Sequence, residues 1–123
     1  MSKKILIVED EPDLLKMLKL EMMHEHYEIV CAFDGKEAYE KYVSEKPDLL
    51  ILDIMIPKIN GLEVCRKIRR QHKDSKTAVL MLTAKSEDVD RIVGRVIGAE
   101  TYLTKPFDRK ILMQEVKKLL GDI

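Results

Sequence analysis

The chain has 123 residues, 46% of them hydrophobic, which fits one compact domain over residues 1–123 with its own core. Basic and acidic side chains number 22 each, so the net charge is zero and no overall field favours nucleic acid or an acidic membrane surface. The apolar runs are far shorter than a membrane span and the start carries no signal-peptide pattern, so we expect a cytoplasmic protein.

Short apolar runs alternate along the chain with segments whose apolar residues recur at helical spacing. The runs predict strands at Lys4–Val8, Tyr27–Ala32, Leu49–Asp53, Thr77–Leu82 and Thr101–Leu103. The periodic segments predict helices at residues 12–25, 35–43, 62–68, 86–97 and 108–121. Five strand and helix pairs with short links imply right-handed crossovers, and therefore an α/β fold with a doubly wound, five-stranded parallel sheet and helices on both faces.

Three acidic residues, Glu9, Asp10 and Glu11, directly follow the first predicted strand. Pro12 then suits the first turn of a helix. A negative charge at a helix start complements the helix dipole, which by itself accounts for Glu11. Glu9 and Asp10 remain as candidates for a site at the end of the strand.

Asp53 ends a run of four apolar residues that has the character of a central strand in a parallel sheet. In open α/β sheets, ligands bind at the carboxyl ends of the strands. A single aspartate after a strand also commonly caps a turn, and the strand by itself leaves both interpretations open.

Two further strands end in polar residues, at Thr83 and Lys105. If the first and third strands are neighbours, Asp10 and Asp53 converge and repel each other, which a hard divalent cation such as Mg²⁺ would relieve. A carboxylate beside a cation, a lysine and a hydroxyl can act as a nucleophile toward phosphorus and form an aspartyl phosphate. The strand ends together therefore predict phosphoryl transfer onto Asp53.

The other reactive side chains give weaker signals. Cys31 and Cys65 lie in apolar patterns without metal-ligand spacing, so we interpret them as reduced core residues. His24 and His26 lack further ligands in a matching pattern, which disfavours a metal site. The basic run at residues 66–70 is typical of a solvated helix face.

Over its whole length the chain resembles the receiver domain of two-component response regulators, of the single-domain, chemotaxis-receiver type. The matching motifs are Val8-Glu9-Asp10-Glu11, Leu52-Asp53-Ile54-Met55-Ile56-Pro57 with Gly61, Leu82-Thr83-Ala84, and Gly98-Ala99 through Tyr102-Leu103-Thr104-Lys105-Pro106-Phe107. The resemblance implies the flavodoxin-like strand order 2-1-3-4-5.

The resemblance also implies that Asp53 accepts a phosphoryl group from a phosphohistidine of a sensor histidine kinase. It assigns a metal ion, Mg²⁺ with Mn²⁺ as an alternative, to Asp10, Asp53 and the Met55 carbonyl, with Glu9 acting through water. Thr83 and Lys105 are expected to contact the phosphoryl oxygens.

The same resemblance implies a cis Lys105–Pro106 bond that aims the lysine inward. It matches Tyr102 to the aromatic switch residue that turns inward when Thr83 moves, with space left by small Ala84. On residue type alone, Tyr102 is more simply a core or edge aromatic.

A receiver of this kind is not an enzyme beyond its own phosphorylation and dephosphorylation. The expected partners are the sensor histidine kinase and either a histidine phosphotransfer protein of a phosphorelay or a downstream target. The target would bind the face built by the helix over 86–97, the Tyr102 strand and the last helix. We expect no direct contact with nucleic acid or membrane, and a monomer or a phosphorylation-dependent dimer.

The chain departs from common receiver patterns at two places. Glu9 replaces an aspartate, which keeps a carboxylate for metal binding but places it on a side chain one methylene longer. Glu100-Thr101 replaces a double acid frequent in receivers that dimerise through this face, which disfavours that dimer. Met55 and Lys85 are expected to flank the phosphoryl group, and apolar Met55 offers no hydrogen bond to an attacking water, so the phosphate should persist.

Three other classes of protein remain as alternatives. A phosphatase with an aspartyl nucleophile usually needs a general acid two residues later, and Met55 cannot be one. A flavin carrier needs a phosphate loop rich in Ser, Thr and Gly, whereas Glu9 to Glu11 would repel phosphate. A degenerate receiver used as a scaffold would not need the intact set of Asp10, Asp53, Thr83 and Lys105.

Overall fold

The computed structural model of the protein describes residues 2–84 and 98–122. Within these residues the strands are β1 (Lys4–Val8), β2 (Glu28–Ala32), β3 (Leu49–Asp53), β4 (Ala78–Ala84) and β5 (Thr101–Lys105). The helices are α1 (Pro12–His24), α2 (Gly35–Glu45), α3 (Gly61–Gln71) and α5 (Arg109–Leu120). The helix predicted over residues 86–97 and the predicted site residue Lys85 lie outside the described residues.

All five strands are parallel and lie side by side in the order β2-β1-β3-β4-β5, which confirms the predicted doubly wound sheet of order 2-1-3-4-5. Every residue of the central strand β3 is buried. The register pairs Val8 with Leu52, and Asp53 with Leu82 on the other side. The residues that follow β1 and the last residues of β4 therefore lie on either side of Asp53, at the carboxyl end of the sheet.

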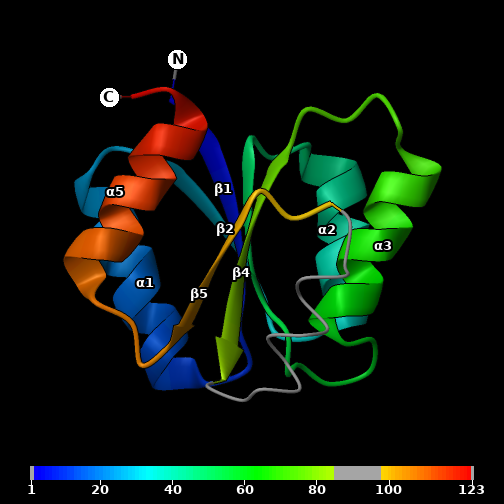
Figure 1. The fold of residues 1–123 in the computed structure, drawn as a ribbon, viewed down its shortest axis with the longest axis horizontal. Coiled ribbons are helices and arrows are strands. Elements are labelled where there is room, and N and C mark those ends of the chain that lie inside the picture. Colours follow the sequence, from blue (N-terminus) through cyan, green and yellow to red (C-terminus); the bar gives the residue numbers. More distant parts are fainter. Residues whose placement is uncertain (1, 85–97, 123) are drawn as a thin grey trace.

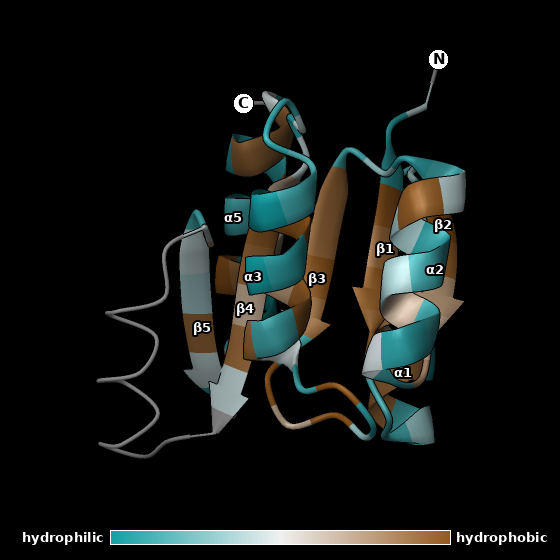
Figure 2. Cartoon of the chain, turned by 90° about the vertical axis from the view of Figure 1, so that its right-hand side faces the viewer, coloured by the Kyte–Doolittle hydropathy of each residue, from teal (hydrophilic) through white to brown (hydrophobic). Residues whose placement is uncertain are grey.

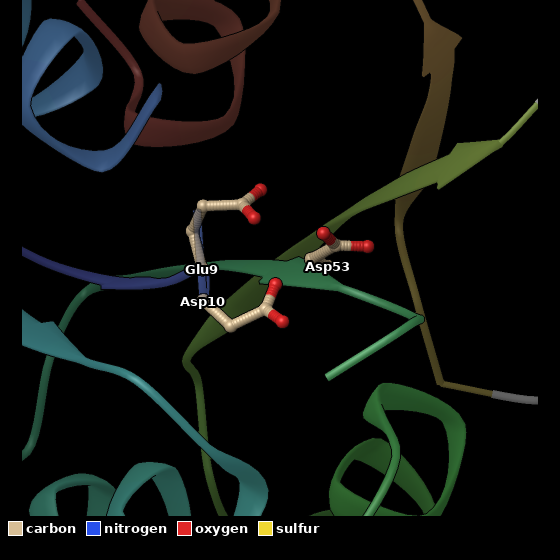
Figure 3. A group of neighbouring side chains, drawn as sticks. All are labelled: Glu9, Asp10 and Asp53. Carbon is tan, nitrogen blue, oxygen red and sulfur yellow. The ribbon is translucent and has the colours of Figure 1, made fainter. Parts of the chain in front are cut away.

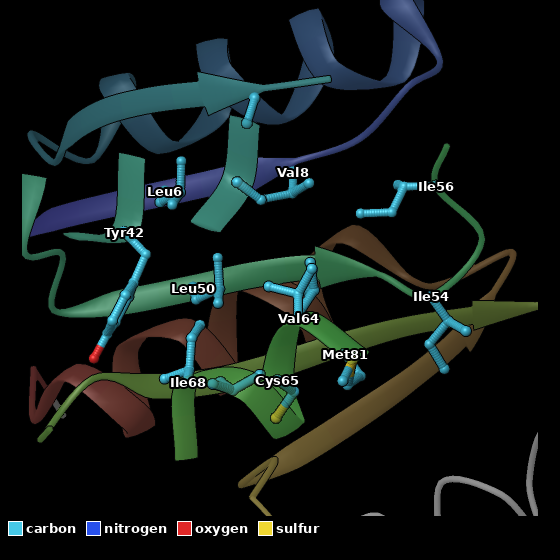
Figure 4. Packing of buried hydrophobic residues seen from close by; sticks show 14 residues of the cluster. Leu6, Val8, Tyr42, Leu50, Ile54, Ile56, Val64, Cys65, Ile68 and Met81 are labelled. Atoms are coloured by element: carbon cyan, nitrogen blue, oxygen red, sulfur yellow. The ribbon is translucent and has the colours of Figure 1, made fainter. Parts of the chain in front are cut away.

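Helices cover both faces of the sheet, with α1 and α5 on one face and α2 and α3 on the other (Figure 1). Successive side chains of a strand point to opposite faces, so the continuous apolar runs fill two cores. Leu6, Leu50 and Met81 pack beneath α2 and α3 (Figure 4), whereas Ile5 and Ile51 pack beneath α1 and α5. Figure 2 shows the matching hydropathy, with β1 and β3 hydrophobic and the outer surfaces of α2 and α3 hydrophilic.

Short polar side chains begin three of the helices at the edge where the strands end. The carboxylate of Asp34 accepts a hydrogen bond from the Glu37 amide at 2.8 Å, and Asn60 caps α3 in the same way. Asp108 accepts from the amide of Lys110 at 2.7 Å. These caps satisfy first-turn amides that have no partner within the helix. The position of each capping residue therefore determines how soon the helix starts after the preceding strand.

The observed strands differ slightly in extent from the predicted ones. Tyr27 and Thr77 precede β2 and β4, because their backbone amides donate to nearby groups and not across the sheet: the Tyr27 amide to the Met22 carbonyl and the Thr77 amide to the Ser75 hydroxyl. β4 and β5 extend further than predicted, to Ala84 and Lys105. Among the described residues, no helix is long and apolar enough to cross a membrane.

Candidate functional site

Three acidic side chains meet where β1 and β3 end. Glu9 and Asp10 directly follow β1, and Asp53 is the last residue of β3, its neighbour in the sheet (Figure 3). Each of the three offers a carboxylate oxygen, and these oxygens lie within 4.8 Å of one another. The convergence predicted from the sequence is therefore present.

The Asp53 carboxylate is buried, with 4% of the residue exposed, and two donors hold it. Lys105 Nζ lies 2.7 Å from Asp53 Oδ2, and the Met55 amide donates to Asp53 Oδ1 at 3.0 Å. The Met55 bond is the turn cap that the sequence left open, whereas the Lys105 contact and the burial go beyond such a cap and give the carboxylate a defined orientation.

Glu9 is more deeply buried than Asp53, with 1% of its surface exposed. Its Oε1 accepts a hydrogen bond from Lys105 at 2.8 Å, and its Oε2 accepts one from the Glu11 amide. Burial raises the pKa of Glu9 from 4.5 to about 7; the charge of Asp53 acts in the same direction, and the Lys105 hydrogen bond opposes both. The direct contact with Lys105 was not predicted from the sequence, because β3 and β4 lie between β1 and β5 and the contact depends on how far the lysine side chain reaches across them.

Lys105 comes from the end of β5, and its peptide bond to Pro106 is cis, as the family resemblance implies. Burial alone would lower the pKa of Lys105, but the hydrogen bonds to Asp53 and Glu9 outweigh that effect and raise it. The side chain therefore stays an ammonium group between two carboxylates.

The two predicted switch residues lie on adjacent strands. Thr83 is fully buried and follows Leu82, the β4 residue paired with Asp53. Tyr102 is paired with Met81 and is 45% exposed. The structure thus places Thr83 beside the acidic site and the Tyr102 side chain at the protein surface.

The donor set fits a hard divalent cation. With Glu9, Asp10, Asp53 and Lys105 all ionised, the cluster carries two uncompensated negative charges, which a divalent ion would balance. The donors are oxygens only, as Mg²⁺ and Mn²⁺ prefer, and exposed Asp10 leaves one side open to water. Met55, two residues after Asp53, is 66% exposed.

One arginine of the basic run on α3 has a structural role that the sequence prediction missed. Arg69 donates from Nε to the Gly98 carbonyl at 2.8 Å and from its terminal nitrogen to both carboxylate oxygens of Glu100. Glu100 also accepts a hydrogen bond from the Val79 amide. The prediction of a fully solvated face is wrong at Arg69, because the acid that pairs with it lies 31 residues later in the chain.

Comparison with known proteins identifies the family. The family model described as the response regulator receiver domain matches residues 5–117. The alkaline phosphatase synthesis transcriptional regulatory protein PhoP of Bacillus subtilis is 42% identical over 120 residues, which are 98% of this chain and 49% of PhoP. The response regulator ArlR of Staphylococcus aureus is 44% identical over 117 residues, 95% of this chain and 52% of ArlR. The chain thus spans about half the length of these relatives.

Comparison with solved structures also finds response regulators. The response regulator TrrA of Thermotoga maritima, solved in complex with Mg²⁺ and BeF, is 42% identical, with a TM-score of 0.84 over 96% of this chain and 99% of TrrA. A response regulator from Chloroflexus aurantiacus has a TM-score of 0.89 at 34% identity, over 98% of this chain and 99% of that one. With its fold, its acidic site and these matches, the chain belongs to the response regulator receiver family of two-component systems.

Proposed function

We propose that this receiver accepts a phosphoryl group on Asp53 from a phosphohistidine of a sensor histidine kinase. The observation that carries the proposal is the buried Asp53 carboxylate, held by Lys105 and the Met55 amide next to two further acids. An isolated structural aspartate would not need this costly concentration of negative charge.

Asp10, Asp53 and the Met55 carbonyl would hold a Mg²⁺ ion, with Glu9 acting through water, and Mn²⁺ is an alternative of the same chemistry. When bound, the ion supplies positive charge that lets the acids stay ionised and neutralises phosphoryl oxygens. The solved complex of TrrA with Mg²⁺ and BeF supports this assignment by similarity.

In the transfer, an Asp53 oxygen attacks phosphorus in line with the departing imidazole nitrogen. The phosphorus–oxygen bond forms as the phosphorus–nitrogen bond breaks, and the imidazole takes up a proton from solvent so that it leaves as a neutral ring. Lys105 would move from the carboxylate to a phosphoryl oxygen, since the new group brings more negative charge than the one it replaces. The hydroxyl of Thr83 would donate to another phosphoryl oxygen.

The output would be a change in partner binding. Movement of Thr83 toward the phosphoryl group would favour an inward position of Tyr102, and the face around β5 and α5 would then bind its partner differently. The partners would be the kinase and either a histidine phosphotransfer protein or a downstream target in the cytoplasm. The domain would catalyse only its own phosphorylation and dephosphorylation, and act as a monomer or a phosphorylation-dependent dimer.

The switch can be tested with Mg²⁺ and beryllium fluoride, which mimics a phosphoryl group on a carboxylate. NMR spectra of the parent should show changed signals for Thr83 and Tyr102 when both reagents are present, and unchanged signals in Asp53→Asn. Parent signals that stay the same for both residues at saturating reagent would contradict the proposal.

A further inference from the structure

The loop between β3 and α3, residues 54–60, leaves the sheet and returns to the same point. At its start, the Ile54 amide donates to the Leu82 carbonyl of β4 at 3.0 Å. At its end, the Gly61 amide donates to the Ile54 carbonyl at 2.9 Å. The base of the loop is therefore tied to the sheet, and its tip must be positioned by other contacts.

The tip of the loop rests on the first residues of α2. The Gly35 amide donates to the Pro57 carbonyl at 3.1 Å, and Lys58 forms an ion pair with Asp34 at 3.5 Å. These residues lie more than 20 positions apart in the chain, so the contact joins the loop of the candidate site to a separate helix.

The contact is close only because residue 35 is glycine. A Cβ atom at Gly35 would lie 1.7 Å from the carbonyl oxygen of Ile59 and 2.8 Å from the Ile59 Cβ. The φ of Gly35 is not in the left-handed region, so no backbone strain demands glycine. Alanine normally favours a helix more than glycine does. The advantage of glycine here is therefore that it lets the Ile59 backbone approach α2 closely.

The loop in turn positions the Asp53 carboxylate. The amide of Met55, within this loop, donates to Asp53 Oδ1 at 3.0 Å. The Met55 side chain is mostly exposed, so packing of that side chain does not fix the amide. The path of the loop sets where the amide points, and the Met55 carbonyl lies on the same path.

We propose that Gly35 is a positioning residue for the phosphoacceptor: it lets the loop tip seat on α2 and thereby holds the Met55 backbone against Asp53. Any side chain at this position must push residues 57–59 away from α2, because the obstacle is backbone and cannot rotate aside. The displacement would reach the Asp53 carboxylate through the Met55 amide.

The test compares Gly35→Ala with Lys36→Ala, a substitution at the next, exposed position of the same helix. The first readout is the amide NMR signal of Met55 in the metal-free protein, which reports its hydrogen bond to Asp53. The second is the Mg²⁺ dissociation constant from titration, and the third is the phosphorylation rate with acetyl phosphate.

In Gly35→Ala we expect a shifted Met55 signal, weaker Mg²⁺ binding and phosphorylation slower by about tenfold to a hundredfold, since small misplacements of a reacting group have effects of this size. Lys36→Ala should match the parent in all three. A Met55 signal and phosphorylation rate in Gly35→Ala equal to those of Lys36→Ala would overturn the inference.

Should Gly35→Ala fail to fold, Lys58→Ala serves instead, since it removes only the exposed ion pair with Asp34. Lys58→Ala should shift the Met55 amide signal by less than the full loss of the Gly35 contact would. An unshifted Met55 signal in Lys58→Ala would overturn the inference. The effect on rate rests on the proposed function, but the Met55 signal does not. A parent that takes up no phosphate would count against the function, whereas a shifted Met55 signal would still support the positioning role.

Discussion

One ammonium group joins the two buried carboxylates of the site: Lys105 Nζ lies 2.7 Å from Asp53 Oδ2 and 2.8 Å from Glu9 Oε1. A single positive charge cannot fully compensate two buried negative ones; burial raises the pKa of Glu9, and the charge of Asp53 acts in the same direction. The site is thus suited to bind additional positive charge, and its charge balance can be measured.

The first prediction concerns the pH dependence of stability without metal. The pKa of Glu9 is about 7 in the folded protein and near its ordinary 4.5 in the unfolded chain. Between these values the folded state holds a proton that the unfolded state has released. The free energy of unfolding should therefore fall as the pH rises from about 4.5 through about 7, by an amount on the order of 3 kcal/mol.

Denaturant titrations in EDTA across this pH range would measure the effect. Glu9→Gln should remove this loss of stability, because the amide does not ionise. Glu40→Gln, an exposed position on α2, should keep the profile of the parent. Parallel profiles for the parent and Glu9→Gln would refute the assignment of this titration to Glu9.

The second prediction concerns the lifetime of the phosphorylated form. Met55 lies two residues after Asp53 with an exposed, apolar side chain that cannot orient an attacking water. Met55→Asn should therefore lose the phosphoryl group faster than the parent. The decay of phosphoprotein after removal of the phosphodonor measures this, and equal decay rates in the two proteins would rule out a role for Met55.

The third prediction separates two arginines on α3. Arg69 binds Glu100 and the Gly98 carbonyl and is largely covered, whereas Arg66 pairs with Glu63 on the exposed helix surface. Arg69→Met should lower the free energy of unfolding by about 1 to 3 kcal/mol, since it leaves charge-assisted hydrogen bonds unmade.

Arg66→Met should cost less than about 1 kcal/mol, because exposed ion pairs contribute little. Denaturant titration of both variants at one pH gives the comparison directly. Equal losses for the two arginines would argue against a special structural role of Arg69.

Much of the fold could be predicted from the sequence because its signals are local. Apolar runs such as Leu49–Leu52 predict the strands, and the polar residues at the ends of four of them predict the site. Helix starts at Asp34 and Asn60 follow from side chains that accept a hydrogen bond three residues later. The strand order came from the family resemblance, since periodicity does not say which strands are neighbours.

The features that the sequence did not predict depend on contacts between distant segments. Glu9 and Lys105 are 96 residues apart on strands that are not neighbours in the sheet, and their contact appears only once the side chains are placed. Gly35 has the sequence context of an ordinary turn after Asp34, and only the packed loop reveals how closely Ile59 approaches it. Arg69 resembles its solvated neighbours until Glu100 is placed beside it.

The central claim is that Asp53 accepts the phosphoryl group, and intact mass spectrometry tests it most directly. The parent and Asp53→Asn would each be incubated with acetyl phosphate and Mg²⁺, with a parallel sample in EDTA. Asparagine keeps an oxygen for the Met55 amide and removes one charge from a repelling cluster, so the variant should melt close to the parent.

The account predicts a gain of one phosphoryl group in the parent with Mg²⁺, and no gain in Asp53→Asn or in EDTA. An equal gain in Asp53→Asn would place the modification on another residue. No gain in the parent, either from acetyl phosphate or from phosphoramidate, would contradict the claim that Asp53 is a working phosphoacceptor.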